Sequence, residues 1–551
     1  NTFESSLQLE PDICVFFFGN NWPLLETPET SPHFHNDQAR QKIGKVFSES
    51  GFDSLADWVV ETRLMRTAGA FAKIHQRGEE NEIKIILVIP EVNLADWQSR
   101  QPVPVLPEDG IHQWYQHYNL AKTYLEEKDW ENLLQAGFDL RELDQVTCPT
   151  TYRLIGLAHL GLDDRTKARA AFQAEIDSVM LPYMAFLNAP QITSYDIGLM
   201  RRAAREYNFG LVDLPKIFAR ISNEKIPDRE FFLDYCHLTI KGIQIAVAAI
   251  AGEICQITDA CDKQPGRFDV EPDITPEDQA LAEFGAAIHT AHRLVSSTDR
   301  KDILSYWCKK AIQTSPGIVS AMVQLVQARM AHLPEVLTEA QQDNLNSNYQ
   351  LLHAHGWKYD NLDIDLIQAI QVVLKEHHPG IDGIIDNLFI EHHAVEDHEI
   401  DLVSSIKYHW NPLEQSYDDL LIDSQQNTRG YFRALWPDSN FVFASRADDD
   451  LQLTLTARIK NIQGNEKIKI FINGSLVESC RITCQFERIQ MIISKSCLVK
   501  GDNKLTIAWP VPRDSTRTFP EITERLLLGH DTSFIPVFGD IYSLVISKPQ
   551  Q

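Results

Sequence analysis

The stretch of residues 11–21 decides the fold class. It reads Pro11-Asp-Ile-Cys-Val-Phe-Phe-Phe18-Gly19-Asn20-Asn21, a continuous apolar run that stops at a polar turn. Such a run is typical of a strand that is buried on both faces of a parallel sheet. Similar runs occupy residues 83–90 and 210–214, and helical stretches at 54–73 and 195–207 precede them. This alternation predicts βαβ units in an open α/β sheet.

The polar residues that follow the predicted strands indicate where a site would lie. Asn20-Asn21 follows the first strand, Glu91-Val92-Asn93 follows the second, and a loop follows Leu214 after the third. In open α/β sheets, ligands bind beyond the carboxyl ends of the strands. We therefore expect a site at this edge of the sheet.

A repeat lies between the second and third predicted strands. Tyr118, Leu120, Asp129 and Phe138 recur 34 residues later as Tyr152, Leu154, Asp163 and Phe172. The period and the pattern of aromatic and small residues are typical of a tetratricopeptide pair, which predicts an all-α insertion at residues 111–182. Two repeats are too few to stand alone. We expect them to pack on the α/β core, which would comprise residues 1–110 and 183–258.

The second half of the chain changes character twice. Residues 259–276 are rich in Asp, Gln, Pro and Gly, which indicates a domain boundary. Residues 277–411 show helical periodicity and predict an all-α domain without an assigned role. Residues 430–548 alternate apolar and polar side chains and predict a β-sandwich, with strands near 451–459, 468–472, 488–494 and 504–509.

Composition excludes several classes of protein. The 551 residues are 44% hydrophobic and 23% charged, which argues against a disordered or fibrous chain. The net charge of −26 repels phosphate backbones, so no nucleic-acid partner is expected. The apolar stretches fall short of the roughly 18 residues that a membrane span needs. Nine cysteines without a zinc-type spacing predict mostly reduced thiols and a cytoplasmic location. Asn1 is not expected to be the true start of the gene product.

The strongest local motif is Phe231-Phe-Leu-Asp234-Tyr-Cys-His237-Leu-Thr-Ile-Lys-Gly242. An Asp three residues before a His can orient the imidazole and stabilise the imidazolium ion when the ring takes up a proton. By spacing alone, the same pattern also fits an ordinary helix cap. Its companion is Gly19-Asn20-Asn21, where a Gly lets the backbone approach a ligand and an Asn amide can donate to an oxyanion.

Together these motifs resemble the SGNH (GDSL-type) hydrolases. Gly19-Asn20-Asn21 is similar to the third block of that family, Gly-x-Asn, and Asp234 to His237 is similar to the fifth. The chain resembles most the branch with a tetratricopeptide-like insertion, whose Glu-Pro-Asp, Asn-Leu-x-Asp and Phe-Leu-Asp-x-x-His-x-Thr-x-x-Gly patterns match residues 10–12, 93–96 and 232–242. The resemblance covers about residues 1–255.

The resemblance implies a fold and a reaction. The fold would be a three-layer, flavodoxin-like parallel sheet whose N-terminal strands are missing from this chain. Asp234 would orient His237, His237 would activate a serine as general base, and Asn21 with Gly19 would form part of the oxyanion hole. The reaction would be ester hydrolysis or acyl transfer on an ester-bearing or acylated small molecule or glycan, without a metal or organic cofactor.

Two features depart from the family pattern. Trp22 stands where the family usually has an acidic residue. The serine block is also not recognisable, so the nucleophile is expected upstream of Asn1, while Ser5 and Ser6 precede the first strand and are expected to be helix residues. The rival hypothesis is therefore a non-catalytic interaction or carbohydrate-binding scaffold, which could contact a protein partner through its helical repeats.

Three further groups of residues have both a functional and a structural interpretation. Glu391-His392-His393 with Asp397-His398-Glu399 could bind a metal or form a solvated acidic segment. His33 and His35 could line the cleft or lie in a loop. Trp436 and Trp509 could stack on sugars or belong to the core of the β-sandwich.

Overall fold

The computed structural model describes residues 2–22, 37–98, 104, 106, 110–144, 148–178, 190–258, 273–293, 300–330, 364–377, 387, 390–391, 393–404, 408–410, 431–434, 436–460, 466–511 and 537–549. The chain forms two compact units. The first runs from Asn1 to Asp273 apart from Glu108–Gln116, and the second comprises Glu108–Gln116 and the described residues from Ile274 onward. Each unit is described by itself.

A parallel sheet of three strands is the centre of the first unit. The strands are β1 (Ile13–Phe17), β2 (Lys84–Ile89) and β3 (Gly210–Asp213), in the order β1-β2-β3. Val15 pairs with Ile86, and Ile86 pairs with Gly210. The strands lie where the three apolar runs predicted them, and the prediction of an α/β chain with a parallel sheet is confirmed at this level.

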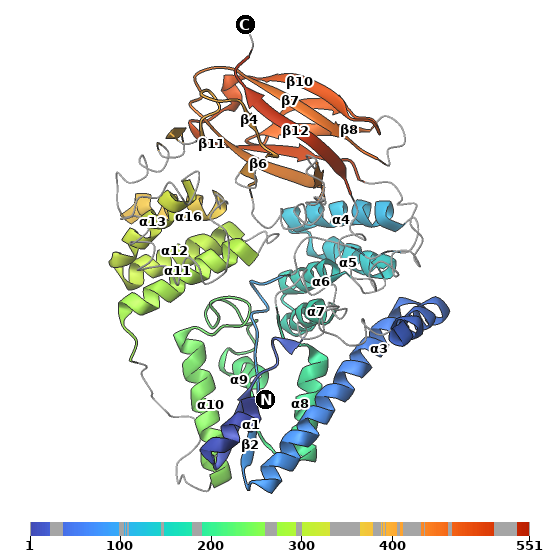
Figure 1. Cartoon of the computed structure of the whole chain (residues 1–551), viewed down its shortest axis with the longest axis vertical. Coiled ribbons are helices and arrows are strands. Elements are labelled where there is room, and N and C mark those ends of the chain that lie inside the picture. Colours follow the sequence, from blue (N-terminus) through green and yellow to red (C-terminus); the bar gives the residue numbers. More distant parts are fainter. Residues whose placement is uncertain are drawn as a thin grey trace. The chain divides into compact units, whose positions relative to one another are not determined.

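Helices cover both faces of this sheet (Figure 1). On one face, α3 (Asp37–Glu80) and α8 (Ser194–Glu206) pack on Leu87 and Ile89. On the other face, α9 (Leu214–Ile221) and α10 (Ile240–Thr258) pack on Ile86 and Val88. The continuous apolar sequence of β2 follows from this arrangement, because each of its faces meets a helix layer.

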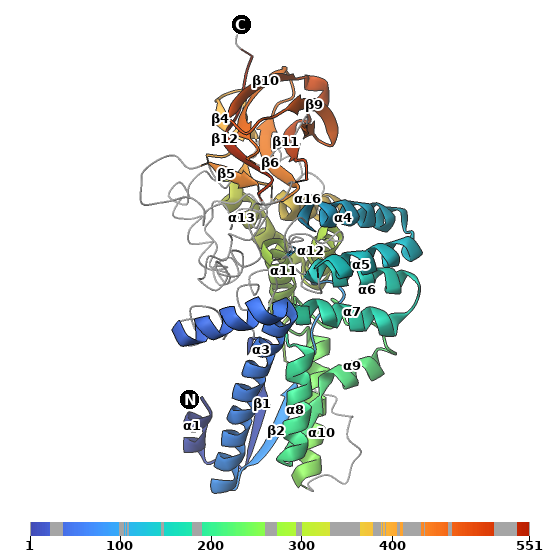
Figure 2. The same cartoon turned by 90° about the vertical axis from the view of Figure 1, so that its right-hand side faces the viewer.

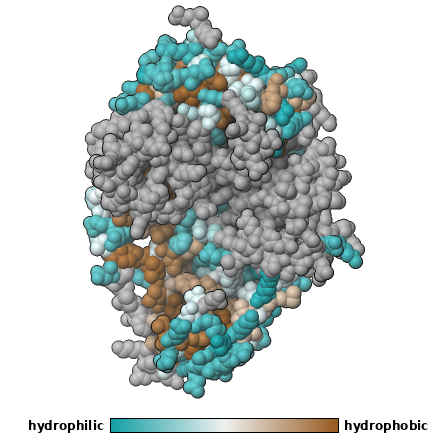
Figure 3. Space-filling model, viewed as in Figure 1, coloured by the Kyte–Doolittle hydropathy of each residue, from teal (hydrophilic) through white to brown (hydrophobic). Residues whose placement is uncertain are grey.

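Part of the α10 face of the sheet remains exposed. Val15 and Phe17 of β1 are 40% and 48% exposed, and Ile243 and Val247 of α10 are similarly open. Figure 3 shows apolar side chains gathered where Figure 1 places α10. This helix has 19 residues and is long and apolar enough to cross a membrane by length and composition alone. The length argument against a membrane span therefore does not apply to α10, although Gly242 and Ala246 pack it against the sheet unit.

A short helix, α1 (Thr2–Ser6), and a 3-10 turn, η1 (Leu7–Leu9), precede β1. Ser5 and Ser6 lie in α1, as expected from the sequence. The Ser6 hydroxyl donates to the carbonyl of Phe3 at 2.8 Å. Both serines therefore lie before the first described strand, away from the loops at its carboxyl end.

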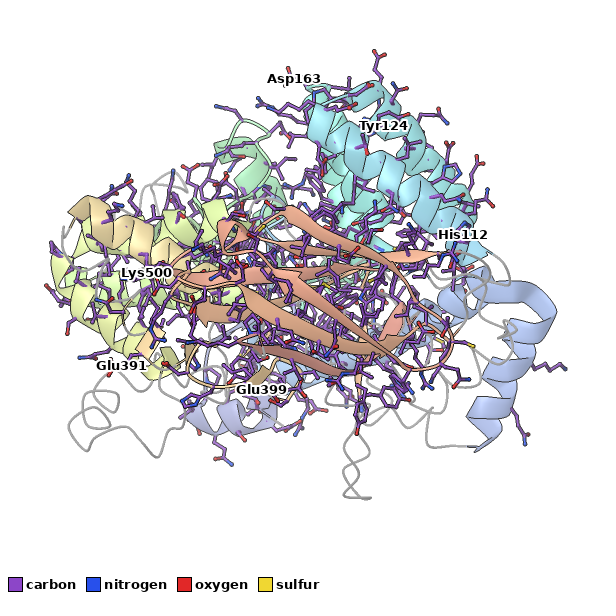
Figure 4. All side chains as sticks on the ribbon, turned by 90° about the horizontal axis from the view of Figure 1, so that it is seen from above. His112, Tyr124, Asp163, Glu391, Glu399 and Lys500 are labelled. Atoms are coloured by element: carbon purple, nitrogen blue, oxygen red, sulfur yellow. The ribbon has the colours of Figure 1, made fainter. Side chains whose placement is uncertain are left out.

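Four consecutive helices occupy the predicted insertion. They are α4 (Gly110–Glu127), α5 (Trp130–Asp144), α6 (Pro149–Gly161) and α7 (Arg165–Ser178). Lys128 lies in the turn between α4 and α5, and Asp163 lies in the turn between α6 and α7. Both have left-handed backbones, with φ of 58° and 60°, so the two turns are equivalent and lie 35 rather than 34 residues apart. The exposed turn at Asp163 is labelled in Figure 4. The predicted 34-residue register is therefore one residue too short for α5 and α7, the second helix of each pair. Phe138 and Phe172 are thus not equivalent: Phe138 is half-buried and Phe172 is buried.

The second unit contains helices and a β-sandwich. Its longer helices are α11 (Pro276–Arg293), α12 (Arg300–Thr314), α13 (Val319–Met330) and α16 (Ile364–His377), and a 3-10 turn, η4 (Pro316–Ile318), precedes α13. The buried Arg300 guanidinium contacts Asp365 at 2.5 Å, and Asp365 also accepts from the Trp410 indole at 2.9 Å. These contacts tie two helices to Trp410, beside the sandwich strand β6 (Asp438–Ser445).

Two antiparallel sheets form the sandwich (Figure 2). One sheet has the order β10-β7-β12-β4 with β5 also on β12, and the other has the order β6-β11-β8-β9. The strands are β4 (Ile400–Asp401), β5 (Phe432–Ala434), β6 (Asp438–Ser445), β7 (Leu451–Arg458), β8 (Lys467–Ile472), β9 (Ser475–Arg481), β10 (Glu487–Ile493), β11 (Gly501–Ala508) and β12 (Gly539–Ser547). The four predicted strands correspond to β7, β8, β10 and β11, whereas the sequence interpretation missed the other five.

Most of the described cysteines are free thiols, in agreement with the expectation of a mostly reduced protein. Cys14, Cys148, Cys236, Cys308, Cys480, Cys484 and Cys497 are free. Cys255, in α10, is disulfide-bonded. Cys255 is thus the exception among described cysteines that are otherwise free.

Candidate functional site

The carboxyl ends of the three parallel strands define one edge of the sheet. The segment 18–22 leaves β1 there, residues 90–97 leave β2, and Asp213 ends β3. The loop that carries the Asp-His motif crosses the same edge, because Asn93 N donates to Tyr235 O at 3.0 Å. The sequence motifs at Asn20-Asn21, Asn93 and Asp234–His237 thus meet at the edge where a site was expected.

Asp234 and His237 form a bonded pair within one turn of chain. Asp234 Oδ2 lies 2.6 Å from His237 Nδ1, and Asp234 Oδ1 accepts from the backbone N–H groups of Cys236 and His237 at 2.9 and 2.8 Å. The Asp234 side chain is 5% exposed and the imidazole is 65% exposed. A buried carboxylate therefore holds a ring that is open to solvent.

The carboxylate also changes the proton affinity of the ring. The hydrogen bond from His237 to Asp234 raises the pKa of His237 above its ordinary value of 6.5, against the opposing effect of burial. Because Nδ1 faces Asp234, Nε2 is the nitrogen that can exchange a proton with a substrate or nucleophile. The pair can act as a general base and then stabilise the imidazolium ion.

The remaining residues of the motif shape the backbone. Thr239 Oγ1 accepts from Gly242 N at 3.3 Å and caps α10, which begins at Ile240. A Cβ at position 242 would lie 2.5 Å from the carbonyl oxygen of Phe231, so only glycine fits there. Leu233 N donates to His237 O at 2.8 Å and closes the turn. The Thr and Gly of the motif thus fix the loop from which the imidazole projects.

The loop after β2 supports the Asp-His turn through hydrogen bonds. Asn93 Nδ2 donates to the backbone carbonyl of Asp234 at 3.1 Å, and Asp96 N donates to Asn93 Oδ1. Asp96 in turn accepts from Arg229 N and Arg229 Nε at 2.7 and 3.1 Å. The Asn93-Leu-Ala-Asp96 stretch, which the resemblance singled out, therefore positions the Asp-His turn through backbone and side-chain contacts.

Side chains from distant segments complete this support. Gln191 Nε2 donates to the carbonyls of Asn93 and Tyr235, each at 3.3 Å. Arg153, from α6 of the helical insertion, donates to the carbonyls of Leu94 and Trp97. The partners of these bonds are 44 to 98 residues apart in sequence. No spacing in the sequence marks Arg153, Gln191 or Arg229, so sequence reasoning missed all three.

An ion pair with a buried carboxylate also joins the insertion to the same loop. Arg169 of α7 lies 2.5 Å from the buried carboxylate of Glu91. Burial raises the pKa of Glu91, while the Arg169 guanidinium acts in the opposite direction. Glu91 directly follows the end of β2, so this pair fixes the start of the loop that supports the motif.

Gly19 and Asn20 are held tightly, whereas Asn21 is exposed. Gly19 is buried with φ of 134°, and a Cβ there would lie 2.6 Å from Ile192 Cδ1. Asn20 Oδ1 accepts from Ile192 N at 3.1 Å, and the Asn20 side chain hydrogen-bonds the Cys236 thiol. The third-block loop therefore touches the Asp-His turn through Asn20. The role of Asn21 and Gly19 in an oxyanion hole stays a prediction.

Trp22 has an apolar role in place of the acidic residue that the family usually carries. Its ring packs 5.1 Å from Phe18 and 6.1 Å from Phe71 of α3. The Trp22 indole therefore extends the core beneath α3.

Asp234, Cys236 and His237 also have metal-ligating atoms within 4.8 Å of one another. The arrangement does not suit a metal. His237 Nδ1 and two backbone N–H groups occupy the Asp234 carboxylate, and burial raises the pKa of the Cys236 thiol, whereas a metal ligand has to be a thiolate. The three residues are better described as a hydrogen-bonded turn.

The other candidate groups from the sequence do not form a functional site within the described residues. No set of three ligands was found within the described parts of the 391–399 segment, and Glu391 and Glu399 lie at separate positions in Figure 4. Trp436 and Trp509 are buried, and the Trp509 indole donates to Ser439 Oγ at 2.9 Å, so the sugar-stacking interpretation is wrong for both. His33 and His35 lie outside the described residues.

Comparisons with known proteins add little. No protein-family model and no curated protein matches the chain. Among solved structures, a ruminal GH26 endo-β-1,4-mannanase is similar with 12% identity and a TM-score of 0.17, covering 28% of this chain and 26% of the mannanase. The GH26-CBM35 β-(1,4)-mannanase of Podospora anserina has 13% identity, a TM-score of 0.15 and 24% coverage of each chain.

The CBM35 module of Cellvibrio japonicus Abf62 has 14% identity and a TM-score of 0.14, covering 23% of this chain and 91% of the module. The chain spans about a quarter of the length of the two mannanases. At these scores, the similarities carry no argument about function.

Proposed function

We propose that this chain is part of an SGNH-like ester hydrolase or acyl-transfer enzyme in which His237 is the general base and Asp234 orients it. The observation that carries the proposal is the buried Asp234 carboxylate, which is bonded to Nδ1 of the exposed His237 ring. The pair lies at the carboxyl edge of the parallel sheet, where open α/β folds bind their ligands.

In the proposed reaction, Nε2 of His237 takes the proton of a serine hydroxyl as its oxygen attacks the ester carbonyl. The imidazolium ion is stabilised by Asp234 and then gives the proton to the leaving alcohol when the ester bond breaks. Water, or an acceptor hydroxyl in the case of acyl transfer, releases the acyl group by the same steps. No metal or organic cofactor takes part in this scheme.

Two parts of the proposal rest on the resemblance. The backbone of Gly19 and the amide of Asn21 would donate to the developing oxyanion, since both belong to the loop that touches the Asp-His turn. Within the described residues, no hydroxyl hydrogen-bonds His237 Nε2. The nucleophilic serine is therefore expected from the Gly-Asp-Ser-like block of the family, and the substrate class is an ester-bearing small molecule or an acylated glycan.

Hydrolysis of p-nitrophenyl acetate by the natural full-length protein tests the proposal. We expect His237→Ala to reduce kcat by about 10³-fold or more, because general-base activation of the serine is lost. His398→Ala is the matched control, since His398 is an exposed histidine of the second unit. Full activity in His237→Ala would rule out the proposed role of this histidine.

The rival function is a non-catalytic interaction or carbohydrate-binding scaffold. It predicts that the full-length protein hydrolyses neither acetyl nor longer acyl esters, whichever residue stands at position 237. A panel of acyl lengths assayed with the unaltered protein separates the two hypotheses.

A further inference from the structure

A cluster of cationic and aromatic side chains lies on the outer face of one sheet of the sandwich, on strands β5, β12, β7 and β10 and the loops beside them. We call it the Arg-Tyr cluster. Its members are Tyr431, Arg433, Arg458, Lys460, Phe486, Asp540 and Tyr542. None of these residues takes part in the site of the first unit, so the inference does not depend on the proposed hydrolase function.

Positive charge exceeds negative charge within the Arg-Tyr cluster. Asp540 is 1% exposed, and its carboxylate lies 2.9 Å from Arg458 Nε, 3.6 Å from Lys460 Nζ and 3.7 Å from Arg433 Nε. Three cations against one carboxylate leave an excess of two positive charges, in a chain whose net charge is −26. A hydrogen bond from Arg433 lowers the pKa of Tyr431, as expected in a positive environment.

The cations are held in place but remain accessible. The Arg458 guanidinium contacts two adjoining rings, 4.3 Å from the centroid of Phe486 and 5.4 Å from that of Tyr431. Arg433 Nη2 donates to the Tyr431 hydroxyl at 2.9 Å. The side chains of Arg433 and Lys460 are nevertheless 27% and 45% exposed. Such preorganised cations lose little side-chain entropy when an anion binds.

The neighbouring surface is polar, carries the exposed cation Arg488, and is flanked by aromatic rings. Ser543 donates to Thr456 at 3.0 Å, and Gln490 donates to Thr454 at 3.5 Å, so hydroxyl and amide groups cover the adjoining strands. Phe486 and Tyr542 are in ring contact at 5.9 Å and are 36% and 42% exposed. Hydroxyl and amide groups beside exposed rings are the features that bind the two surfaces of a sugar.

The charges on this face favour a carboxylate ligand over a nucleic acid. The outward positions of β7 and β10 carry no carboxylate within the described residues, being Gln452, Thr454, Thr456, Arg458, Arg488, Gln490 and Ile492. Nucleic-acid binding needs an extended basic surface that neutralises many phosphates. An excess of two positive charges instead matches one or two carboxylates. We infer that the Arg-Tyr cluster binds an acidic carbohydrate whose sugar rings carry carboxylate groups.

Calorimetric titration of the full chain with tri-galacturonate tests this inference. We expect binding of tri-galacturonate and at least tenfold weaker binding of its methyl ester, which keeps the sugar and removes the charges. Lys460→Gln should weaken binding about fivefold, as the loss of one exposed charge contact does. Lys469→Gln is the matched control, because Lys469 is an exposed lysine of β8 in the other sheet.

In both the Lys460 and the Tyr542 variants, the buried Asp540 carboxylate keeps its contacts with Arg433 and Arg458. Tyr542→Ser should weaken binding without altering the circular-dichroism spectrum, since this ring is exposed. The inference is overturned if the methyl ester binds equally well, if Lys469→Gln loses as much affinity as Lys460→Gln, or if tri-galacturonate does not bind at millimolar concentration. Competition by equimolar inorganic phosphate or a short single-stranded DNA would also overturn it.

Discussion

The bond between Asp234 and His237 determines how activity should depend on pH. A general base acts in its neutral form, and the bond to Asp234 raises the pKa of His237 above 6.5. Activity of the natural full-length protein should therefore rise with pH along a limb centred above 6.5. In Asp234→Asn the largest cause of the raised pKa is removed, so this limb should move to lower pH. The plateau of kcat should also fall, by about 10³–10⁴-fold.

The pH–rate profile of kcat/KM for a p-nitrophenyl ester measures this effect, because it reports the pKa values of the free enzyme. Asp397→Asn, an exposed carboxylate of the second unit, is the control and should leave the limb unchanged. A limb that stays in place in Asp234→Asn would show that another group titrates.

Gly19 offers a test of the third-block loop by stability. Its φ of 134° is unfavourable for any side chain, and a Cβ would meet Ile192. Gly19→Ala should lower the free energy of unfolding by about 1–3 kcal/mol. Gly198→Ala, in α8 with open space around it, should instead raise it by about 0.5–1 kcal/mol. Urea denaturation measures the free energy of unfolding of both variants, which should change in opposite directions. Equal changes in the two variants would contradict backbone strain at position 19.

At the residue scale, the sequence revealed only those site residues whose spacing is local. Asp234 and His237 are three positions apart, and their bond follows from that spacing within one turn. Arg153 and Gln191 act on carbonyls 44 to 98 residues away, so nothing near them in the sequence indicates their role. The contact between Asn20 and Cys236 likewise depends on the arrangement of the whole sheet.

The helical insertion supports the site through helix α6. Arg153 forms a buried ion pair with Glu175 at 2.7 Å and donates to carbonyls of the loop after β2. Arg153→Met would remove the cation from a buried ion pair and should lower the free energy of unfolding by about 3–5 kcal/mol. Arg141→Met, an exposed position of α5, should change it by less than about 0.5 kcal/mol. Chemical denaturation that found the two variants equally stable would show that α6 does not support this loop.

Elements were predictable where the apolar pattern was unbroken. β1 and β2 are runs of apolar residues, and β7 alternates strictly between buried and half-buried positions. β9 was missed because its sequence, Ser-Leu-Val-Glu-Ser-Cys-Arg, has no buried alternate face. The short strands β4 and β5 exist only through pairing with β12, which no local pattern can indicate.

The sandwich extends beyond the residues that its sequence pattern marked. Ile400 pairs with Ile546, Ala394 bridges to Ala444, and His409 bridges to Phe441, so residues before 430 complete the sheets. A fragment of residues 390–551 should therefore unfold cooperatively with a β-type circular-dichroism spectrum. A fragment of residues 430–548 should melt at a lower temperature, because those pairings are lost. Identical melting of the two fragments would contradict this extension.

The short span between Asp234 and His237 has a consequence for how this molecule can diverge. Both residues belong to a single turn of the chain. Substitutions at Asn93, Gln191 or Arg153 would therefore displace them together and leave their mutual bond intact. The pKa of His237 is thus set by Asp234, whereas the position of the pair is set by other residues. In the proposed enzyme, mutations in the supporting residues would therefore change substrate preference while the pH optimum stays the same.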